Sequence, residues 1–309
     1  MNPDISVVCP VYFAEKTLTE LSERLVAMFE KINVTYEIIY VDDRSLDKSW
    51  SIIKDLSCEN DKIKGLRLSE NFGQHKAIAA GLEVTQGNSV VVLDCDLQDV
   101  PEEIEKLYDK SKEGFEIVRG MRIVRNDSFL KRMSSLFFHK IFHFLSGVKM
   151  DSSISNFGVY DRKVIEAFNL NLEKEIFFAP TIHSIGFRKC DIEVKHSSRA
   201  YGKSTYTFIK LLKLALKIAL VSTNRPLKIS ITVGIIVAFF SLLFAFYNVI
   251  ARLTGLIQLE GFTSTIFSIW FVGALLLMSQ GVLGLYLGSV FNEVKNRPRY
   301  FIDETVNLK

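Results

Sequence analysis

Two uncharged segments near the C-terminal end constrain the fold of this chain more than any other feature. Residues 229–251 contain no charged side chain and are bounded by Lys228 and Arg252, and a second uncharged segment covers residues 261–292. A helix of about 20 apolar residues is long enough to cross the hydrocarbon core of a bilayer. Because only a short connector separates the two segments, we expect a transmembrane helical hairpin. The competing interpretation, two buried core helices of a soluble protein, is weakened by the second segment, which is longer than most globular helices.

Basic residues are concentrated on the outer flanks of this hairpin. They are Arg225, Lys228, Lys295, Arg297 and Arg299. The connector has one basic residue, Arg252. Since positively charged flanks stay on the cytoplasmic side of a membrane, we expect both termini in the cytoplasm. The four cysteines are scattered and form no Cys-x-x-Cys pair, which agrees with a reducing compartment.

Two further segments have apolar residues at helical spacing. The first covers residues 129–145, and the second covers residues 208–219, where Lys210, Lys213 and Lys217 occupy another face. Amphipathic helices of this kind can lie in the headgroup layer of a membrane. The alternative is that each segment packs against the soluble part of the protein.

The chain ahead of the hairpin alternates predicted strands and helices. The predicted strands are residues 5–9, 36–41, 63–68 and 89–93, and the predicted helices are residues 17–32, 49–57 and 76–84. This alternation predicts an α/β fold with a mainly parallel sheet, helices on both faces, and ligands at the carboxyl ends of the strands. The net charge of +3 is too small to indicate a nucleic-acid partner.

Acidic and turn-forming residues follow three of the predicted strands. They lie at residues 10–15, at Asp42-Asp43 and at residues 94–98. Carboxylates separated by one residue, such as Asp94 and Asp96, can share a divalent cation, which neutralises a diphosphate. Each group also has a plainer explanation, because Asp42-Asp43 could cap the next helix and Asp94 and Asp96 could be solvated loop acids. Together with a membrane anchor, the pattern favours an enzyme with a nucleotide-activated donor and a lipid acceptor.

In this order, the motifs of the chain resemble those of family 2 glycosyltransferases with the GT-A fold. More narrowly, they resemble polyprenyl-phosphate glycosyltransferases, a group that includes dolichyl-phosphate mannose synthases and bacterial enzymes that load sugars onto undecaprenyl phosphate. The resemblance covers nearly the whole chain. Its landmarks are Cys9-Pro10-Val11-Tyr12, Val41-Asp42-Asp43-Arg44-Ser45, Asn71-Phe72-Gly73-Gln74-His75, Asp94-Cys95-Asp96-Leu97-Gln98, Gly120-Met121-Arg122, residues 156–162, Arg199-Ala200-Tyr201-Gly202-Lys203-Ser204 and residues 293–298.

The resemblance implies roles for particular side chains. The implied nucleotide-binding residues are Pro10, Tyr12, Glu15, Asp42, Asp43 and Asp94, with Asp42 accepting a hydrogen bond from a uracil ring. The implied ligands of Mg²⁺ or Mn²⁺ are Asp94, Asp96 and Gln98. The implied catalytic residues are Asp96, Arg122, Arg199 and Ser204, the last three at positions that contact phosphate groups.

The chain departs from the family pattern at two places. Phe13-Ala14-Glu15 stands where many members have Asn-Glu after the Pro-Val-Tyr sequence, which leaves the acidic contact at this position open. Glu70 precedes Asn-Phe-Gly where a basic residue is common, so we assign it no phosphate contact.

The function implied by the resemblance is a membrane-anchored, inverting transfer of a sugar from a nucleotide donor, expected to be a UDP-sugar, to undecaprenyl phosphate. The product would be a lipid-linked monosaccharide used for O-antigen or other envelope glycans, made at the cytoplasmic face of a bacterial inner membrane. The expected division is a catalytic domain at residues 1–204, a juxtamembrane amphipathic helix at 205–227, transmembrane helices at 228–292 and a cytoplasmic tail at 293–309. Association of two copies could use the small residues Gly281, Gly284 and Gly288.

Two other functions fit the same sequence. One is a processive polysaccharide synthase with the same catalytic fold, although such enzymes use a Gln-x-x-Arg-Trp motif and neither Trp50 nor Trp270 follows an arginine. The other is a non-catalytic membrane scaffold that retains the fold. The intact set of Asp94, Asp96 and Gln98 argues against the scaffold.

Overall fold

The computed structural model describes residues 2–122, 154–171, 173–174, 176–197, 225–254, 261–295 and 297–308. The chain divides into two compact units. The first unit comprises Met1–Arg132, Asp151–Thr205 and Arg297–Lys309 and contains a β-sheet, and the second comprises Met133–Met150 and Tyr206–Asn296 and contains two long helices.

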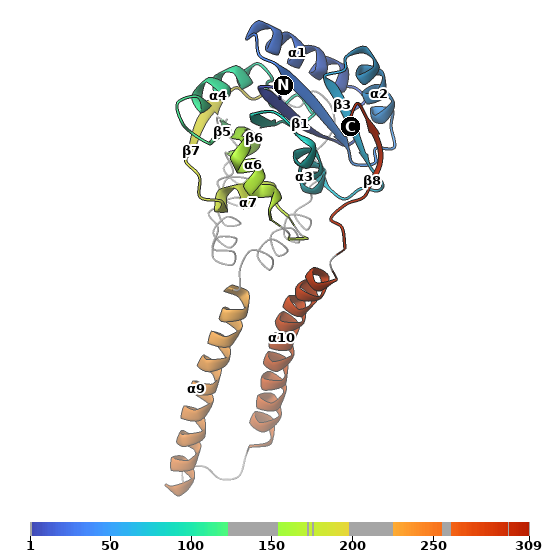
Figure 1. Ribbon diagram of the computed structural model, residues 1–309. Coiled ribbons are helices and arrows are strands. Elements are labelled where there is room, and N and C mark those ends of the chain that lie inside the picture. The colour runs from blue at the N-terminus through green and yellow to red at the C-terminus, as the bar shows by residue number, and fades with distance from the viewer. Residues whose placement is uncertain are drawn as a thin grey trace. The chain divides into compact units, whose positions relative to one another are not determined.

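The first unit is built on an eight-stranded sheet with the order β7-β5-β6-β4-β1-β2-β3-β8 (Figure 1). Its strands are β1 (Ile5–Val11), β2 (Tyr36–Asp42), β3 (Ile63–Leu68), β4 (Ser89–Val92), β5 (Ile117–Arg122), β6 (Ile154–Asp161), β7 (Lys189–Val194) and β8 (Ile302–Val306). The pairs β4-β1, β1-β2, β2-β3 and β5-β7 are parallel. Strand β6 is antiparallel to β4 and β5, and β8 is antiparallel to β3. The predicted α/β fold with a mainly parallel sheet is therefore confirmed.

The central strands are apolar on both sides because helices cover both faces of the sheet. Strands β1 and β2 are buried along their whole lengths, as expected for parallel strands between two layers of helices. Helices α1 (Leu18–Lys31), α2 (Ser49–Glu59) and α4 (Glu103–Ser111) contribute to the core on one face. Helices α3 (Gln74–Val84), α6 (Arg162–Asn169) and α7 (Phe178–Ser184) contribute to the core on the other face.

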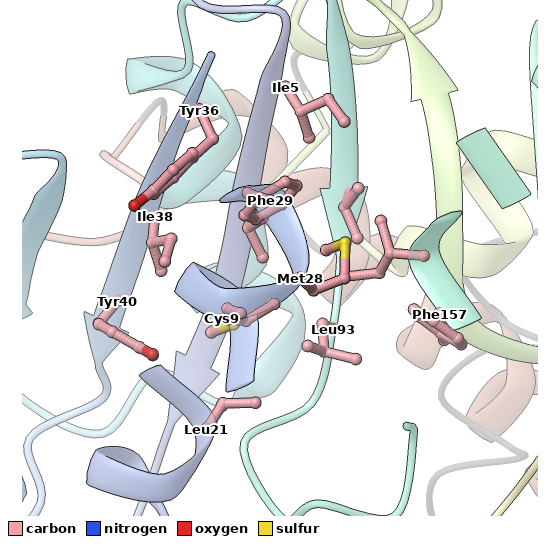
Figure 2. Close-up of a cluster of buried hydrophobic side chains, with 14 of the residues drawn as sticks. Ile5, Cys9, Leu21, Met28, Phe29, Tyr36, Ile38, Tyr40, Leu93 and Phe157 are labelled. Atoms are coloured by element: carbon pink, nitrogen blue, oxygen red, sulfur yellow. The ribbon is translucent and has the colours of Figure 1, made fainter. Parts of the chain in front are cut away.

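The core on the α1 face is shown in Figure 2. Phe29 of α1 stacks on Tyr36 of β2 with ring centroids 4.7 Å apart, and Ile5 and Cys9 of β1 lie beside them. Helix α3 approaches the other face closely because residue 81 is glycine. A Cβ atom at Gly81 would lie 2.4 Å from Cγ1 of Val8. The close approach packs α3 directly against β1 and β2.

The order of the strands reverses between β1 and β4. From β1 the chain proceeds outward through β2 and β3, and it then crosses back to place β4 on the other side of β1. In open α/β sheets, ligands bind outside the carboxyl ends of the strands at this switch point. The loops that follow β1, β2 and β4 are therefore the first place to look for a site.

The segment after the second long helix returns to the sheet as β8, beside β3 (Figure 1). Asn307 fixes its end by donating hydrogen bonds to the backbone oxygens of Ser57 at 2.7 Å and Ile63 at 3.0 Å. Residues 293–309 were expected to form a tail, and the sequence does not predict this strand, because Ile302–Val306 is short and acidic.

The second unit contains α9 (Arg225–Leu253) and α10 (Phe262–Val294), which contact each other. Their most apolar windows, Leu227–Phe244 and Ser268–Phe291, have mean hydropathies of 2.3 and 1.7, and 0% of either window is buried. By length and composition, both helices are able to cross a membrane. The two predicted spans coincide with these helices. The predicted amphipathic segments, residues 129–145 and 208–219, lie outside the described residues.

Candidate functional site

The three loops at the switch point are joined by hydrogen bonds. The backbone N–H of Phe13, after β1, donates to Oγ of Ser45, after β2, at 3.1 Å. The hydroxyl of Thr17 donates to the backbone oxygen of Cys95, after β4, at 2.7 Å. These contacts hold the three loops together as one edge of the sheet.

Each of these loops contains a non-glycine residue with a left-handed backbone. The φ angles are 55° at Phe13, 58° at Arg44 and 59° at Leu97. This region is uncommon for residues with a bulky side chain, and such strain concentrates at functional sites. The strain therefore marks the edge that the sheet topology indicates.

Asp42 ends β2 and is fully buried, with 0% exposure. Its Oδ1 accepts a hydrogen bond from the backbone N–H of Ser45 at 3.1 Å. Its Oδ2 lies 3.3 Å from Nε of Arg67, yet neither atom has a hydrogen-bond partner within the described part of the chain. Burial raises the pKa of Asp42, and the contacts with Ser45 and Arg67 partly oppose this shift. Because buried polar atoms are nearly always hydrogen-bonded, Oδ2 is an acceptor whose hydrogen-bonding capacity the described residues leave unused.

Asp43 has a different environment from its neighbour. Its Oδ1 accepts from the backbone N–H of Phe72 at 2.7 Å, and its Oδ2 accepts from that of Gly73 at 2.8 Å. Burial raises the pKa of Asp43, and these two hydrogen bonds lower it. The structure thus shows Asp43 holding the turn that begins α3, and its predicted role in nucleotide binding stays a prediction.

The acidic loop after β4 is held from two sides. Oδ1 of Asp94 accepts from Nε2 of Gln74, the first residue of α3, at 2.7 Å. Oδ1 of Asp96 accepts from the backbone N–H of Gln98 at 3.1 Å. The backbone oxygen of Gln98 accepts from the backbone N–H of Ser197 at 2.9 Å. Asp94, Asp96 and Gln98 are all partly exposed. The side chains of Asp94 and Asp96 are therefore held at the edge of the sheet, and all three residues remain accessible.

The chemistry of this loop suits a hard divalent cation. Carboxylate and amide oxygens, as in Asp94, Asp96 and Gln98, are ligands that Mg²⁺ and Mn²⁺ prefer. Among the described residues, no group of three or more His, Cys, Asp or Glu side chains could hold a metal ion. Two carboxylates leave several positions around an octahedral ion to other oxygens, such as those of a diphosphate. The residues therefore fit a cation that binds together with a phosphorylated ligand, rather than a preformed protein cage.

The other predicted nucleotide contacts follow β1. Pro10 is buried within the strand, and the side chain of Tyr12 is 50% exposed, with its ring edge-to-face against Phe13. Oε2 of Glu15 accepts from the backbone N–H of Lys48 at 3.2 Å, at the start of α2. Tyr12 therefore offers an open ring face near the switch point, whereas Glu15 helps to begin a helix.

The predicted phosphate contacts are only partly described. Arg122 ends β5, and its side chain lies outside the described part of the structure. Arg199 and Ser204 lie wholly outside the described residues. Ser197, two positions before Arg199, is hydrogen-bonded to the acidic loop.

Two contacts at this edge were missed by the sequence analysis. Arg67 lies opposite Asp42 in the register of β2 and β3, and Gln74 contacts Asp94. The available signal for Arg67 was a second charged residue, after Lys64, within the six-residue strand Ile63–Leu68. Gln74 lies inside the Asn71–His75 motif, but nothing in the motif indicates which strand end its side chain reaches.

Comparison with known proteins identifies the family to which this arrangement belongs. Residues 6–168 match the family described as glycosyl transferase family 2. The chain belongs to glycosyl transferase family 2. An uncharacterised glycosyltransferase of Synechocystis sp. is 33% identical over 310 residues, which cover 100% of this chain and 98% of the relative. The undecaprenyl-phosphate 4-deoxy-4-formamido-L-arabinose transferase of Aeromonas hydrophila is 35% identical over 306 residues, covering 98% of this chain and 94% of the relative. This family 2 glycosyltransferase is thus related to undecaprenyl-phosphate sugar transferases.

A solved structure supports the fold of the family 2 domain. The glucosyl-3-phosphoglycerate synthase of Mycobacterium tuberculosis, solved with Mn²⁺, UDP and phosphoglyceric acid, matches with a TM-score of 0.50. The match covers 72% of this chain and 78% of the synthase at 16% identity. It shows that the domain has a GT-A-like fold.

Proposed function

We propose that this family 2 glycosyltransferase moves one sugar from a UDP-sugar to undecaprenyl phosphate and releases UDP. The observation that carries the proposal is Oδ2 of the buried Asp42, which has no hydrogen-bond partner among the described residues and lies at the same sheet edge as Asp94 and Asp96. The lipid acceptor is supported by the activity for which the Aeromonas relative is named, and this relative aligns with nearly the whole chain.

The nucleoside end of the donor binds at β1 and β2. The N3–H group of uracil donates to Oδ2 of Asp42, which lacks a hydrogen-bond partner within the described part of the chain. The exposed ring of Tyr12 provides a face for the base. A site that hydrogen-bonds one N–H group discriminates strongly against a base that lacks it, so cytosine, which has no N3–H, binds poorly. The synthase used for comparison was itself solved with UDP.

The diphosphate end binds at the loop after β4. Asp94, Asp96 and Gln98 would hold Mg²⁺ or Mn²⁺ there, and the ion, when bound, neutralises charge on the leaving diphosphate. Gln74 fixes the orientation of Asp94. Arg122, Arg199 and Ser204 are proposed to contact phosphate groups, for which the planar fork of arginine is well suited.

Transfer is a direct displacement at the anomeric carbon. An oxygen of the lipid phosphate forms a bond to this carbon on the side opposite UDP, while the bond to the diphosphate oxygen breaks and its electron pair leaves with UDP. The attacking oxygen is already anionic at neutral pH, so no proton has to be removed and no general base is required. The configuration of the sugar inverts.

The membrane part delivers the lipid substrate. Residues 228–292 are proposed to span the inner membrane as α9 and α10, with the catalytic domain at residues 1–204, the juxtamembrane helix at 205–227 and the tail at 293–309 in the cytoplasm. The lipid-linked monosaccharide would then supply O-antigen or other envelope glycan modification. Gly281, Gly284 and Gly288 of α10 offer a small-residue face for pairing with a second copy.

The test uses the full chain in detergent or lipid nanodiscs with undecaprenyl phosphate, Mn²⁺ and labelled UDP-, CDP- or GDP-sugars. We expect one UDP-sugar to give a single-sugar product that enters the organic phase and is cleaved by mild acid. A long polymer would instead identify a processive synthase. If no donor gives a product and the protein does not bind UDP, the protein is instead a non-catalytic membrane scaffold.

A further inference from the structure

Four residues lie in one row across neighbouring strands, and the last three of them alternate in charge. Val11 of β1 pairs with Asp42 of β2, Asp42 with Arg67 of β3, and Arg67 with Glu304 of β8. The preceding residue of β8, Asp303, forms an ion pair with Arg44 in the loop after β2. The C-terminal strand therefore brings carboxylates to Arg67, which contacts the buried Asp42, and to Arg44, in the loop after it.

Glu304 is held at this position by several donors. Its Oε2 accepts from Nε1 of Trp50 at 2.9 Å and lies 3.6 Å from Nζ of Lys54. Its Oε1 lies 3.7 Å from Nη1 of Arg67. These contacts keep Glu304 ionised, and its pKa is lowered, first by the hydrogen bond from Trp50 and then by Lys54 and Arg67.

The guanidinium of Arg67 is shared rather than committed to one carboxylate. Its Nε lies 3.3 Å from Oδ2 of Asp42 without forming a hydrogen bond, its Nη1 faces Glu304, and its centre lies 5.8 Å from the ring centroid of Trp50. An arginine beside a buried carboxylate normally forms a hydrogen-bonded pair, often through two parallel bonds. Here the two groups form an ion pair at 3.3 Å without a hydrogen bond, and Glu304 and the Trp50 ring attract the guanidinium in another direction.

We infer that Glu304 is a positioning residue for the nucleotide site: it keeps Arg67 from forming a hydrogen bond with Asp42, so that the hydrogen-bonding capacity of Oδ2 stays unused until the base binds. The inference rests on the proposed function. It also gives the segment after α10 a part in donor recognition, since α10 ends at Val294 and β8 begins at Ile302. Without the Glu304 carboxylate, Arg67 would close onto Asp42 and compete with the N3–H group of the base.

The first experiment compares the donor kinetics of the full-length wild type, E304Q and E304K. The amide introduced by E304Q can still accept from Trp50 but no longer attracts Arg67, so we expect the donor KM to rise about threefold, the scale of an exposed ion pair. A lysine would repel Arg67, and we expect a larger rise, about tenfold. We expect kcat, the KM for undecaprenyl phosphate and the unfolding temperature of E304Q to stay close to the wild-type values.

A double-mutant cycle shows whether the effect passes through Arg67. In R67Q the competing guanidinium is absent, so adding E304Q is expected to leave the donor KM of R67Q unchanged. The matched control is N307A, which loses the hydrogen bonds to Ser57 and Ile63 at the end of the same strand. We expect N307A to lower the unfolding temperature and to leave the donor KM unchanged.

The outcomes separate this inference from the proposed function. If the wild type binds UDP and transfers sugar while E304Q has an unchanged donor KM, the inference is wrong and the proposed function stands. The inference is also wrong if E304Q raises the donor KM equally in the R67Q background, or if N307A raises it as much as E304Q does. A wild type that neither binds UDP nor transfers sugar would overturn the proposed function and this inference with it.

Discussion

Strand β2 carries one buried carboxylate near each end, and the two differ in how their oxygens are used. Glu37, near the amino end, is 3% exposed, and Asp42, at the carboxyl end, is 0% exposed. Oε1 of Glu37 accepts from the hydroxyl of Ser6 and from the backbone N–H of Gln86, and its Oε2 is paired with Nζ of Lys64 at 2.5 Å. By contrast, only Oδ1 of Asp42 accepts a hydrogen bond in the part of the chain that the structure describes.

The difference shows how burial and hydrogen bonding together separate support from recognition. A buried carboxylate whose oxygens are all paired is part of the framework, because leaving any of them unpaired costs the desolvation of that group. A buried carboxylate with one open oxygen carries a cost that a ligand can relieve. Glu37 therefore ties β1, β2, β3 and the turn before β4 together, and Asp42 is poised for a donor from outside.

The largest expected effect on sugar transfer comes from removing an acid of the loop after β4, at the same sheet edge as Asp42. D96A should reduce sugar transfer by about 1,000-fold, because the leaving diphosphate loses part of its charge neutralisation in the transition state. The unfolding temperature should stay close to that of the wild type, since Asp96 is partly exposed. Initial rates with saturating donor and Mn²⁺, with and without excess EDTA, measure the effect. Full activity of D96A, or activity that resists EDTA, would rule out the metal role.

At Glu37, near the amino end of β2, the expected effect is on the stability of the fold and not on sugar transfer. E37Q removes the charge that compensates Lys64, whose side chain is only 15% exposed, and should cost about 3 kcal/mol of unfolding free energy. The donor KM of the folded fraction should be unchanged. Urea unfolding and donor kinetics at low temperature measure the two quantities. A rise in the donor KM without a loss of stability would contradict the assignment of Glu37 to the framework.

At Asp42, the carboxyl end of the same strand, we expect an effect on donor binding and no loss of stability. D42N keeps the size of the side chain but weakens the acceptor for the base, and the donor KM should rise about tenfold. Burial raises the pKa of Asp42 above its ordinary value of 3.8, so its ionised form destabilises the fold at pH values above that pKa. D42N should therefore be at least as stable as the wild type at pH 7.5, and any gain should disappear as the pH falls below 3.8.

The same raised pKa predicts the pH dependence of donor binding. As the pH falls through the pKa of Asp42, the carboxylate is protonated and the donor KM should rise, at a higher pH than an exposed aspartate would allow. The decrease of kcat/KM for the donor at acidic pH should be smaller in D42N than in the wild type. A D42N profile identical to that of the wild type would assign this decrease to another group.

Much of this contrast was accessible from the sequence. The alternation of apolar runs and helical segments predicted β1 to β4, and the acidic residues at the strand ends predicted Asp42 and Asp94 at one edge. The sequence did not show which carboxylates have all of their oxygens hydrogen-bonded or ion-paired. Asp42 and Asp43 are adjacent and chemically identical, yet the backbone turns them in different directions, and only Asp43 reaches Phe72 and Gly73.

The other features that the sequence did not predict depend on contacts between residues far apart along the chain. Strand β8 joins β3 across most of the sequence, and nothing in a short acidic segment indicates a partner so far away. Arg67 and Gln74 likewise gain their importance from residues on other strands or loops. Local patterns predict elements, whereas contacts between elements depend on register and on close approaches such as that at Gly81.

The smallest expected effect at the catalytic site concerns a group behind the metal ligands. Q74M has a side chain of similar length and keeps a residue suited to helix α3, but it cannot donate to Asp94. Because outer-shell partners orient ligands without binding the ion, the Mn²⁺ concentration for half-maximal activity should rise about fivefold, with little change in kcat at saturating Mn²⁺. The donor KM at saturating Mn²⁺ should also stay unchanged, which distinguishes Q74M from D42N at the nucleoside end. Unchanged Mn²⁺ dependence in Q74M would mean that the loop after β4 orients Asp94 without help from α3.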